Sequence, residues 1–388
     1  MEDWLKSDNL VIEKGDGIYL YDTDGNKYID GVSSLWVNVY GHRKKEIDKA
    51  ISDQLKKISH STLLGLANVP SILLAKELIK VAPKRLKKVF YSDNGATSVE
   101  IALKMAYQYW QHKGLKNKTK FIALKESYHG DTIGSVSVGG IKLFHNIFKP
   151  LLFDAYFAYE NIEKIIEDHH NEVAAVIMEP LVQGAGGIIV QPKGFLKKVR
   201  NLCTKYKVLL IADEVAVGFG RTGKMFACDH EHISPDLMCV AKGLTGGYLP
   251  VAATLATNEI FKAFLGTGKT FYHGHTYTGN PLGCAAALAT LKLFKKEKLL
   301  KKLQPKIKLL AKELEKFKTN GEVKEIRQCG LIAGIELNQK ASEACLLARK
   351  YGLIIRPLGN VIVIMPPFAI SNLQLKKMLQ IIYKVILP

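Results

Sequence analysis

Short apolar segments alternate with helical segments through the middle of the chain, and this alternation limits the possible folds more than any other feature. The apolar segments are typical of buried strands and lie at residues 88–91, 120–124, 173–178, 208–212, 237–240 and 251–256. Segments with helical spacing precede or separate them at residues 45–58, 69–81, 96–111 and 194–206. This α/β pattern predicts a mostly parallel sheet that is covered by helices on both faces.

The two ends of the chain predict a smaller α+β unit. Residues 9–30 read as short strands, with an Asp-Gly pair that is typical of a hairpin turn. In the last hundred residues, long helices are followed by expected strands at residues 331–337, 353–356 and 361–365. One further helix is expected at residues 341–351. We therefore expect residues 45–280 to form a large cofactor-binding domain, and residues 1–44 and 281–388 to form a small one.

Charge and cysteine content narrow the class of protein. The formal charge of +19 fits a nucleic-acid-binding protein, but 48 of the 55 basic residues are lysines, and they are dispersed. We interpret the excess as solvated helix faces, and expect no nucleic-acid partner. The six cysteines form no C-x-x-C pair, so we expect reduced thiols and no metal site. The sequence shows neither a long apolar run nor a secretory signal, which predicts a cytoplasmic protein without a membrane partner.

Two charged residues at the ends of predicted strands indicate a site for a cofactor. Asp213 ends a buried strand, and in an open α/β sheet this edge binds ligands. By itself, Asp213 is more readily interpreted as a helix cap or a metal ligand than as a partner of a cationic ring nitrogen. Lys242 directly follows another apolar strand and precedes glycines. Partial burial would favour the neutral form of its amine, which is a nucleophile for carbonyl compounds.

Other segments supply what a pyridoxal phosphate site needs around such a pair. Gly95 and Ala96 start a predicted helix and could bind an anion, although an ordinary helix cap explains them as well. Tyr128 follows a strand and could stack on a planar ring. Pyridoxal phosphate requires a Schiff-base lysine, an acid at the ring nitrogen, a stacking ring and a phosphate seat. A basic nucleic-acid-binding protein would leave the pair of Asp213 and Lys242 unexplained.

These motifs resemble those of the class III aminotransferases, a family of pyridoxal phosphate enzymes with fold type I. The resemblance extends from about residue 10 to the end of the chain, and its most specific part is the segment 213–223 together with Lys242. It implies that Lys242 forms the Schiff base with the cofactor and shuttles the substrate proton, while Asp213 pairs with the pyridinium nitrogen. Tyr128 would cover one face of the ring.

The resemblance also implies roles for residues around this centre. Gly95 and Ala96 would bind the cofactor phosphate, and Glu179 and Gln183 would line the pocket. The family forms obligate homodimers with active sites at the interface. In this arrangement, Thr276 would reach the phosphate from the partner subunit.

Within the family, several stretches resemble the branch that aminates 8-amino-7-oxononanoate in biotin biosynthesis. They lie at residues 33–38, 102–110, 128–134, 179–187 and 225–230. That acceptor is a long apolar chain with a carboxylate, which suits Trp36 and Arg356 as substrate-binding residues beside Tyr128 and Lys242. The amino donor of this branch is S-adenosylmethionine or lysine, and His275 is closer to the lysine-using enzymes. An aminotransferase for ornithine, 4-aminobutyrate or a related diamine is the alternative.

The start of the chain differs from the family pattern. Members usually carry an aromatic segment that contributes to the substrate pocket and ends near the position of Met1. We therefore expect either a shortened start or a more open acceptor pocket.

Overall fold

The computed structural model describes residues 9–386, and its centre is a seven-stranded sheet in the order β4-β12-β11-β10-β7-β5-β6. The strands are β4 (Leu86–Ser92), β5 (Lys120–Leu124), β6 (Ala155–Ala158), β7 (Val173–Met178), β10 (Leu209–Asp213), β11 (Leu237–Val240) and β12 (Ala252–Thr257). Of these, β12 alone runs opposite to the other six strands. The predicted α/β class and mostly parallel sheet are confirmed.

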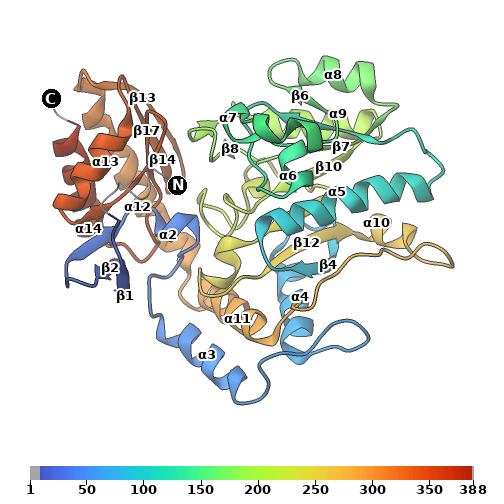
Figure 1. The fold of residues 1–388 in the computed structure, drawn as a ribbon, viewed down its shortest axis with the longest axis horizontal. Helices are drawn as coiled ribbons and strands as arrows, with labels where there is room; N and C mark the ends of the chain where they lie inside the picture. Colours follow the sequence, from blue (N-terminus) through green and yellow to red (C-terminus); the bar gives the residue numbers. More distant parts are fainter. Residues whose placement is uncertain (1–8, 387–388) are drawn as a thin grey trace.

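Helices cover both faces of this sheet, because alternate residues of each buried strand point to opposite sides. In β10, Leu209 and Ile211 pack in one cluster with α5 (Gly95–His112) and α10 (Asn258–Ala263). Leu210 and Ala212 pack in the other cluster with α8 (Ile162–His169) and α9 (Phe195–Lys205). In Figure 1, α5 crosses in front of the sheet.

The two ends of the chain meet in two smaller sheets. One has the order β1-β2-β3-β15 and the other β13-β14-β17-β16. Their strands are β1 (Ile12–Asp16), β2 (Tyr19–Asp22), β3 (Lys27–Asp30), β13 (Val323–Cys329), β14 (Ile332–Leu337), β15 (Leu353–Ile354), β16 (Arg356–Leu358) and β17 (Val361–Ile364). The parallel pairing of β3 with β15 joins the beginning of the chain to its end. These sheets lie to the left of the large sheet in Figure 1.

The remaining helices are distributed between these layers. They are α2 (Ser33–Trp36), α3 (Lys45–Leu55), α4 (Val69–Val81), α6 (Ile133–Ser137), α7 (Lys142–His145), α11 (Pro281–Lys296), α12 (Leu299–Leu314), α13 (Ala341–Lys350) and α14 (Asn372–Val385). Four short 3₁₀ helices are η1 (Asn146–Leu151), η2 (Ala227–His230), η3 (Lys242–Thr245) and η4 (Glu315–Thr319). Helix α11 packs against α3 and α4. None of the helices in residues 9–386 has the length and apolar character needed to cross a bilayer.

Sequence patterns located the long elements well and the short ones poorly. The predicted strands at residues 120–124, 173–178 and 237–240 and the predicted helix at 69–81 have the same bounds in the structure. Strand β6 was not predicted, nor was the hairpin of β8 (Val182–Gln183) and β9 (Ile189–Val190), whose strands of two residues are too short for a periodic signal. The first eight residues of the expected small domain, where the sequence is expected to depart from the family pattern, lie outside the described residues.

Candidate active site

A cavity of about 690 Å³ lies at the carboxyl ends of the central strands. Its lining contains most of the residues that the sequence analysis selected: Trp36, Gly95, Ala96, Tyr128, Glu179, Asp213, Lys242 and Arg356. They come from the turn α2, the start of α5, segments that follow β5, β7 and β11, the end of β10, and strand β16. The fold therefore brings together residues that are up to 320 positions apart in the chain, from Trp36 to Arg356.

Lys242 stands at the turn where the chain leaves β11. Its φ of 43° is uncommon for a residue other than glycine, and such strain is often found at functional sites. The Nζ atom lies 4.7 Å from the centroid of the Trp36 ring. Burial lowers the pKa of this amine, against the opposing effect of the Asp213 and Glu179 carboxylates. The environment thus favours the neutral, nucleophilic form of the amine.

Asp213 is held by two hydrogen bonds at the end of β10. Its Oδ2 lies 2.7 Å from Nδ1 of His129, and its Oδ1 accepts a bond of 3.0 Å from the backbone N–H of Val215. His129 is buried, and its Nε2 has no hydrogen-bond partner in residues 9–386. With Nδ1 as the donor, His129 fixes the orientation of the carboxylate. Sequence analysis missed His129, whose only signal was its position beside Tyr128.

Tyr128 connects two carboxylates on the cavity wall. Its hydroxyl donates to Oδ2 of Asp131 at 2.7 Å, and its backbone N–H donates to Oε1 of Glu179 at 3.0 Å. Burial raises the pKa of the Tyr128 hydroxyl, so the group stays neutral. Burial also raises the pKa of Glu179 to about 7. Asp131 and Phe144 line the same cavity, and the sequence analysis gave neither of them a role.

The start of α5 presents backbone N–H groups to the cavity. The Asn94 side chain accepts from the N–H of Thr97, whereas the N–H groups of Gly95 and Ala96 have no acceptor within the helix. A side chain at position 95 would meet Val215 at 2.7 Å, so only glycine fits there. This helix start can therefore bind a phosphate group.

Trp36 is carried by a turn of unusual conformation. The φ angles of Ser33, Ser34, Leu35 and Trp36 are 51°, 46°, 74° and 70°, so α2 is a left-handed turn. For residues other than glycine, this conformation costs roughly 1–2 kcal/mol each. The Trp36 ring lies against Gly184, where a side chain would approach it to 3.0 Å.

Two predicted residues lie outside the cavity lining. Thr276 is exposed in the loop that precedes α11, next to His275, whose Nε2 is 4.0 Å from Oδ1 of Asp93. The loop thus passes near the start of α5. Gln183 is buried and donates from Nε2 to the carbonyl of Lys125 at 2.6 Å, so in the structure it connects β8 to the turn that follows β5.

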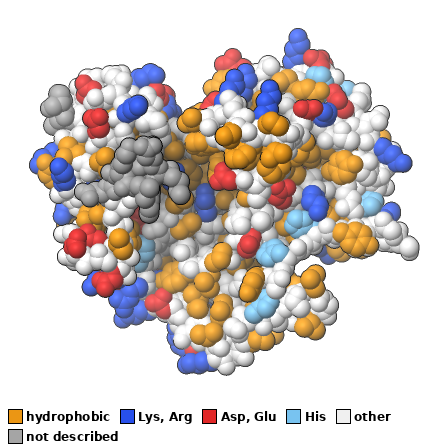
Figure 2. All heavy atoms as spheres, in the orientation of Figure 1, with side chains coloured by type: hydrophobic (Ala, Val, Ile, Leu, Met, Phe, Trp, Pro, Cys, Tyr) orange, Lys and Arg blue, Asp and Glu red, His pale blue; other side chains and the backbone are white. Residues whose placement is uncertain are grey.

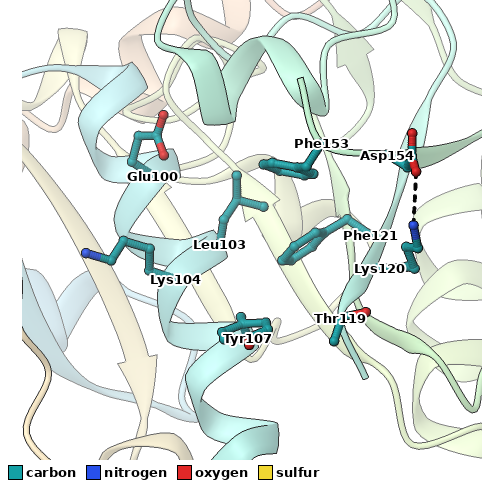
Figure 3. A pocket seen from close by; sticks show the side chains of 9 residues that line it. All are labelled: Glu100, Leu103, Lys104, Tyr107, Thr119, Lys120, Phe121, Phe153 and Asp154. Atoms are coloured by element: carbon teal, nitrogen blue, oxygen red, sulfur yellow. Dashed lines mark hydrogen bonds and ion pairs between the residues drawn. The ribbon is translucent and has the colours of Figure 1, made fainter. Parts of the chain in front are cut away.

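A second cavity, of about 310 Å³, lies between α5 and the start of β5 and is drawn in Figure 3. Its walls include the rings of Tyr107, Phe121 and Phe153. Lys120 binds Asp154 at 3.2 Å, and both are surface side chains. The lining contains no buried carboxylate paired with histidine, so this cavity lacks the chemistry of the larger one. Within residues 9–386, no group of three or more His, Cys, Asp or Glu side chains could bind a metal.

The larger cavity fits pyridoxal phosphate. It offers an amine at Lys242, a carboxylate at Asp213, an aromatic ring at Tyr128 and uncovered N–H groups at the start of α5. Val215 also lines it and gives a planar ring an apolar surface to rest on. These groups satisfy the four requirements of the cofactor.

Comparisons with known proteins agree with this chemistry. The profile of class III aminotransferases matches residues 4–386. The adenosylmethionine-8-amino-7-oxononanoate aminotransferase of Geobacter sulfurreducens is 50% identical, and the match covers 96% of this chain and 90% of that protein. The enzyme of the same name from Staphylococcus aureus is also 50% identical, with 99% and 93% covered.

Solved structures give the same result. The crystal structure of the enzyme of that name from Methanocaldococcus jannaschii has a TM-score of 0.97 at 49% identity, and the match covers 99% of this chain and 94% of that one. An amine transaminase from an uncultivated Pseudomonas species, in its PLP-bound form, has a TM-score of 0.92 at 33% identity, with 98% and 95% covered.

Proposed function

The chain belongs to the class III aminotransferase family, and we propose from this premise that it aminates the ketone of 8-amino-7-oxononanoate to give 7,8-diaminononanoate in biotin biosynthesis. The amino donor is S-adenosylmethionine or lysine. One observation carries the proposal: relatives with this activity in their names are about 50% identical over nearly the whole chain. The cavity agrees, because it combines an amine–carboxylate pair with an apolar ring and an arginine.

Pyridoxal phosphate is the cofactor of the family. When the cofactor is bound, it withdraws electrons from the substrate carbon whose amine is exchanged. Lys242 would hold it covalently, and the same amine would remove and return the proton at that carbon, a task that its lowered pKa favours. Asp213, oriented by His129, would keep a proton on the ring nitrogen. Gly95 and Ala96 would bind its phosphate.

The acceptor would extend from Lys242 towards the smaller sheets. Trp36 provides an apolar wall for its methylene chain, and Tyr128 provides a second ring on the same cavity. Arg356 stands on β16 at the exposed side of the cavity, where a guanidinium can bind a carboxylate through two hydrogen bonds. An amine and an arginine on one cavity suit a keto acid that also carries a carboxylate.

The reaction can be tested directly with purified protein loaded with pyridoxal phosphate. We expect 8-amino-7-oxononanoate to be converted to the diamine with S-adenosylmethionine or lysine as donor, as followed by mass spectrometry. Each donor is added alone, so the same assay identifies it. Amination of the keto partners of ornithine or 4-aminobutyrate without amination of 8-amino-7-oxononanoate would contradict the proposal and favour an ω-aminotransferase.

Substitution of Arg356 separates the two substrates. We expect Arg356→Met to raise the KM for the acceptor about 30-fold, because the carboxylate loses a charged, bidentate partner. The half-reaction with the amino donor should change by less than about threefold, because we assign Arg356 to the acceptor. Stopped-flow measurements of each half-reaction check the difference. Arg349→Met, on the neighbouring helix α13, is the matched control and should leave the acceptor KM unchanged.

We further propose that the chain forms a homodimer whose active sites lie at the interface. Large apolar side chains are exposed around α4 and the loop before it, and in the loop before α11: Leu64, Leu66, Val69, Ile72, Tyr272 and Tyr277. Figure 2 shows apolar side chains over the lower part of the molecule, where α4 and α11 lie. An exposed apolar surface of this kind is typical of a protein–protein interface. Thr276, next to Tyr277, would then reach the phosphate of the partner's cofactor.

A mixture of two inactive chains tests this arrangement. Lys242→Ala and Thr276→Ala chains are unfolded and refolded together, and we expect about a quarter of the sites to regain full activity, since each mixed dimer has one intact site. The control mixes wild-type chains with the double variant, which gives mixed dimers without an intact site. If Thr276 acts within its own chain instead, the first mixture will regain no full activity and the control will keep about half of its sites rather than about a quarter, and that outcome contradicts the proposal.

The chain is also proposed to work as two domains in the cytoplasm. Residues 45–280 would form the large domain, and residues 1–44 and 281–388 the small one. The pairing of β3 with β15 supports this division, because it joins the two ends in one sheet. Six free cysteines, five of them buried, suit a reducing compartment.

A further inference from the structure

The left-handed turn of residues 33–36 requires a partner that holds it. No glycine stands among its four residues, although glycine is the residue that adopts these φ angles without strain. Backbone bonds of 2.8 Å from Trp36 N–H to the Val32 carbonyl, and of 3.0 Å from Val37 N–H to the Ser33 carbonyl, close the turn. These bonds are local and would form equally well in a right-handed turn. The left-handed form must therefore be selected by contacts outside the turn.

The Ser33 hydroxyl makes one of these contacts and donates to the Met365 carbonyl at 2.6 Å. Asp30 makes two others, both to the middle of the turn. Its Oδ1 accepts from the backbone N–H of Ser34 and its Oδ2 from the Ser34 hydroxyl, both at 2.8 Å. Both bonds end on the residue whose φ is 46°, in the middle of the turn. The Asp30 side chain is fully buried, with an exposed fraction of 0%. A carboxylate that is removed from water holds its hydrogen-bond donors strongly, because the donors replace its hydration.

The backbone of Asp30 is fixed by strand pairing, and its third side-chain partner, His42, is fixed by a further hydrogen bond. Asp30 ends β3, where its N–H donates to the carbonyl of Ile18 and its neighbour across the sheet is Ile354 of β15. Oδ2 also lies 3.1 Å from Nε2 of His42, and Nδ1 of that ring lies 3.1 Å from Nδ2 of Asn38. With Nε2–H as donor and Nδ1 as acceptor, every member of this chain of hydrogen bonds is satisfied.

The last two residues of the turn, Leu35 and Trp36, line the cavity. Trp36 is 7% exposed, lines the cavity and has no hydrogen-bond partner for Nε1 among the described residues, so no polar contact of its own fixes the indole. The ring is placed by the backbone that carries it and by packing against Gly184 and Lys242. A right-handed turn would direct the side chain of residue 36 elsewhere.

We propose that Asp30 is a positioning residue for the acceptor pocket: it selects the left-handed turn and thereby holds Trp36 beside Lys242. The use of this pocket for the acceptor rests on the proposed function, whereas the coupling between Asp30 and Trp36 does not. Asp30 touches neither substrate nor cofactor, and it acts through Ser34 and the turn.

The first test follows Trp36 in cofactor-free protein. Substitution of Trp4 and Trp110 by Phe leaves Trp36 as the only one of three tryptophans. In this background we expect Asp30→Asn to raise acrylamide quenching of tryptophan fluorescence at least about twofold, because turns of other conformations become populated and expose the ring. Asp22→Asn is the matched control. Asp22 is also buried and accepts from Asn26 and Tyr28, but it holds a hairpin away from the cavity.

The second test uses enzyme that retains all three tryptophans and is loaded with pyridoxal phosphate. Asp30→Asn should raise the KM for 8-amino-7-oxononanoate about tenfold with kcat changed by less than about threefold, and Asp22→Asn should change neither, even where both lower the melting temperature. Equal quenching in Asp30→Asn and Asp22→Asn would overturn the proposal, whatever the enzyme converts. If Asp30→Asn does not fold, Ser34→Ala removes one of its bonds and should shift quenching in the same direction, and no shift there overturns the proposal as well.

If the protein does not aminate this acceptor at all, the proposed function fails while the quenching result still decides the coupling of Asp30 to Trp36. The two failures are therefore distinguishable.

Discussion

Lys242→Ala should abolish transamination, with a loss of about 10⁴-fold or more in kcat, because one amine both holds the cofactor and moves the substrate proton. The variant should still fold, since the side chain lines a cavity and its removal relieves a buried amine whose pKa is lowered. The absorption band of cofactor bound to the lysine should disappear from the purified protein. Single-turnover assays and absorption spectra measure both effects.

Lys306→Ala is the matched control for this result. The Lys306 amine also has a pKa that burial lowers, and it donates to the carbonyl of Phe368 at 2.6 Å, but it does not line the cavity. Its loss should lower the melting temperature and leave the absorption band and kcat per bound cofactor unchanged. A Lys242→Ala enzyme that keeps the band and more than about a tenth of the activity would contradict the assignment.

The large sheet could be predicted from the sequence because its strands are buried on both faces and its helices are long. Val173–Met178 is apolar at each of its six positions, and its short length and β-branched residues favour a buried strand over a helix. Asp213 and Lys242 were found for a related reason: each is a charged residue at the end of such a strand, where side chains meet at the ligand-binding edge. The roles of Trp36 and Arg356 were predicted only from the resemblance to the family.

The remaining site residues depend on contacts that sequence patterns do not contain. His129 contacts Asp213 across 84 positions of the chain, and Asp30 acts through the φ angle of Ser34. The left-handed turn could not be predicted, because Ser-Ser-Leu-Trp contains no glycine and local propensity favours a right-handed turn. Tertiary hydrogen bonds override that propensity, and such conflicts between local and global preference are common at functional sites.

Asp213→Asn should lower kcat about 10²- to 10³-fold while the cofactor stays bound, because the substitution removes a charge and keeps the geometry. The oxygen of the substituted amide can still accept from the N–H of Val215. The amide nitrogen can donate to Nδ1 of His129, since that ring can move its proton to Nε2, an atom without another partner in the described residues. Only the negative charge beside the cofactor's ring nitrogen is lost, so that nitrogen no longer keeps its proton and the ring accepts electrons poorly.

The control for this prediction is Asp236→Asn, because Asp236 is a buried carboxylate that binds Arg200 at 2.6 Å and lies outside the cavity. Breaking that buried ion pair should cost stability, about 3 kcal/mol or more, and leave kcat per bound cofactor unchanged. Asp213→Asn should show the reverse, with a small change in melting temperature and a large loss of rate in single-turnover assays. If Asp213→Asn reacts within about fivefold of the wild-type rate, the ring nitrogen does not depend on this carboxylate, and the pairing of Asp213 with His129 serves the fold alone.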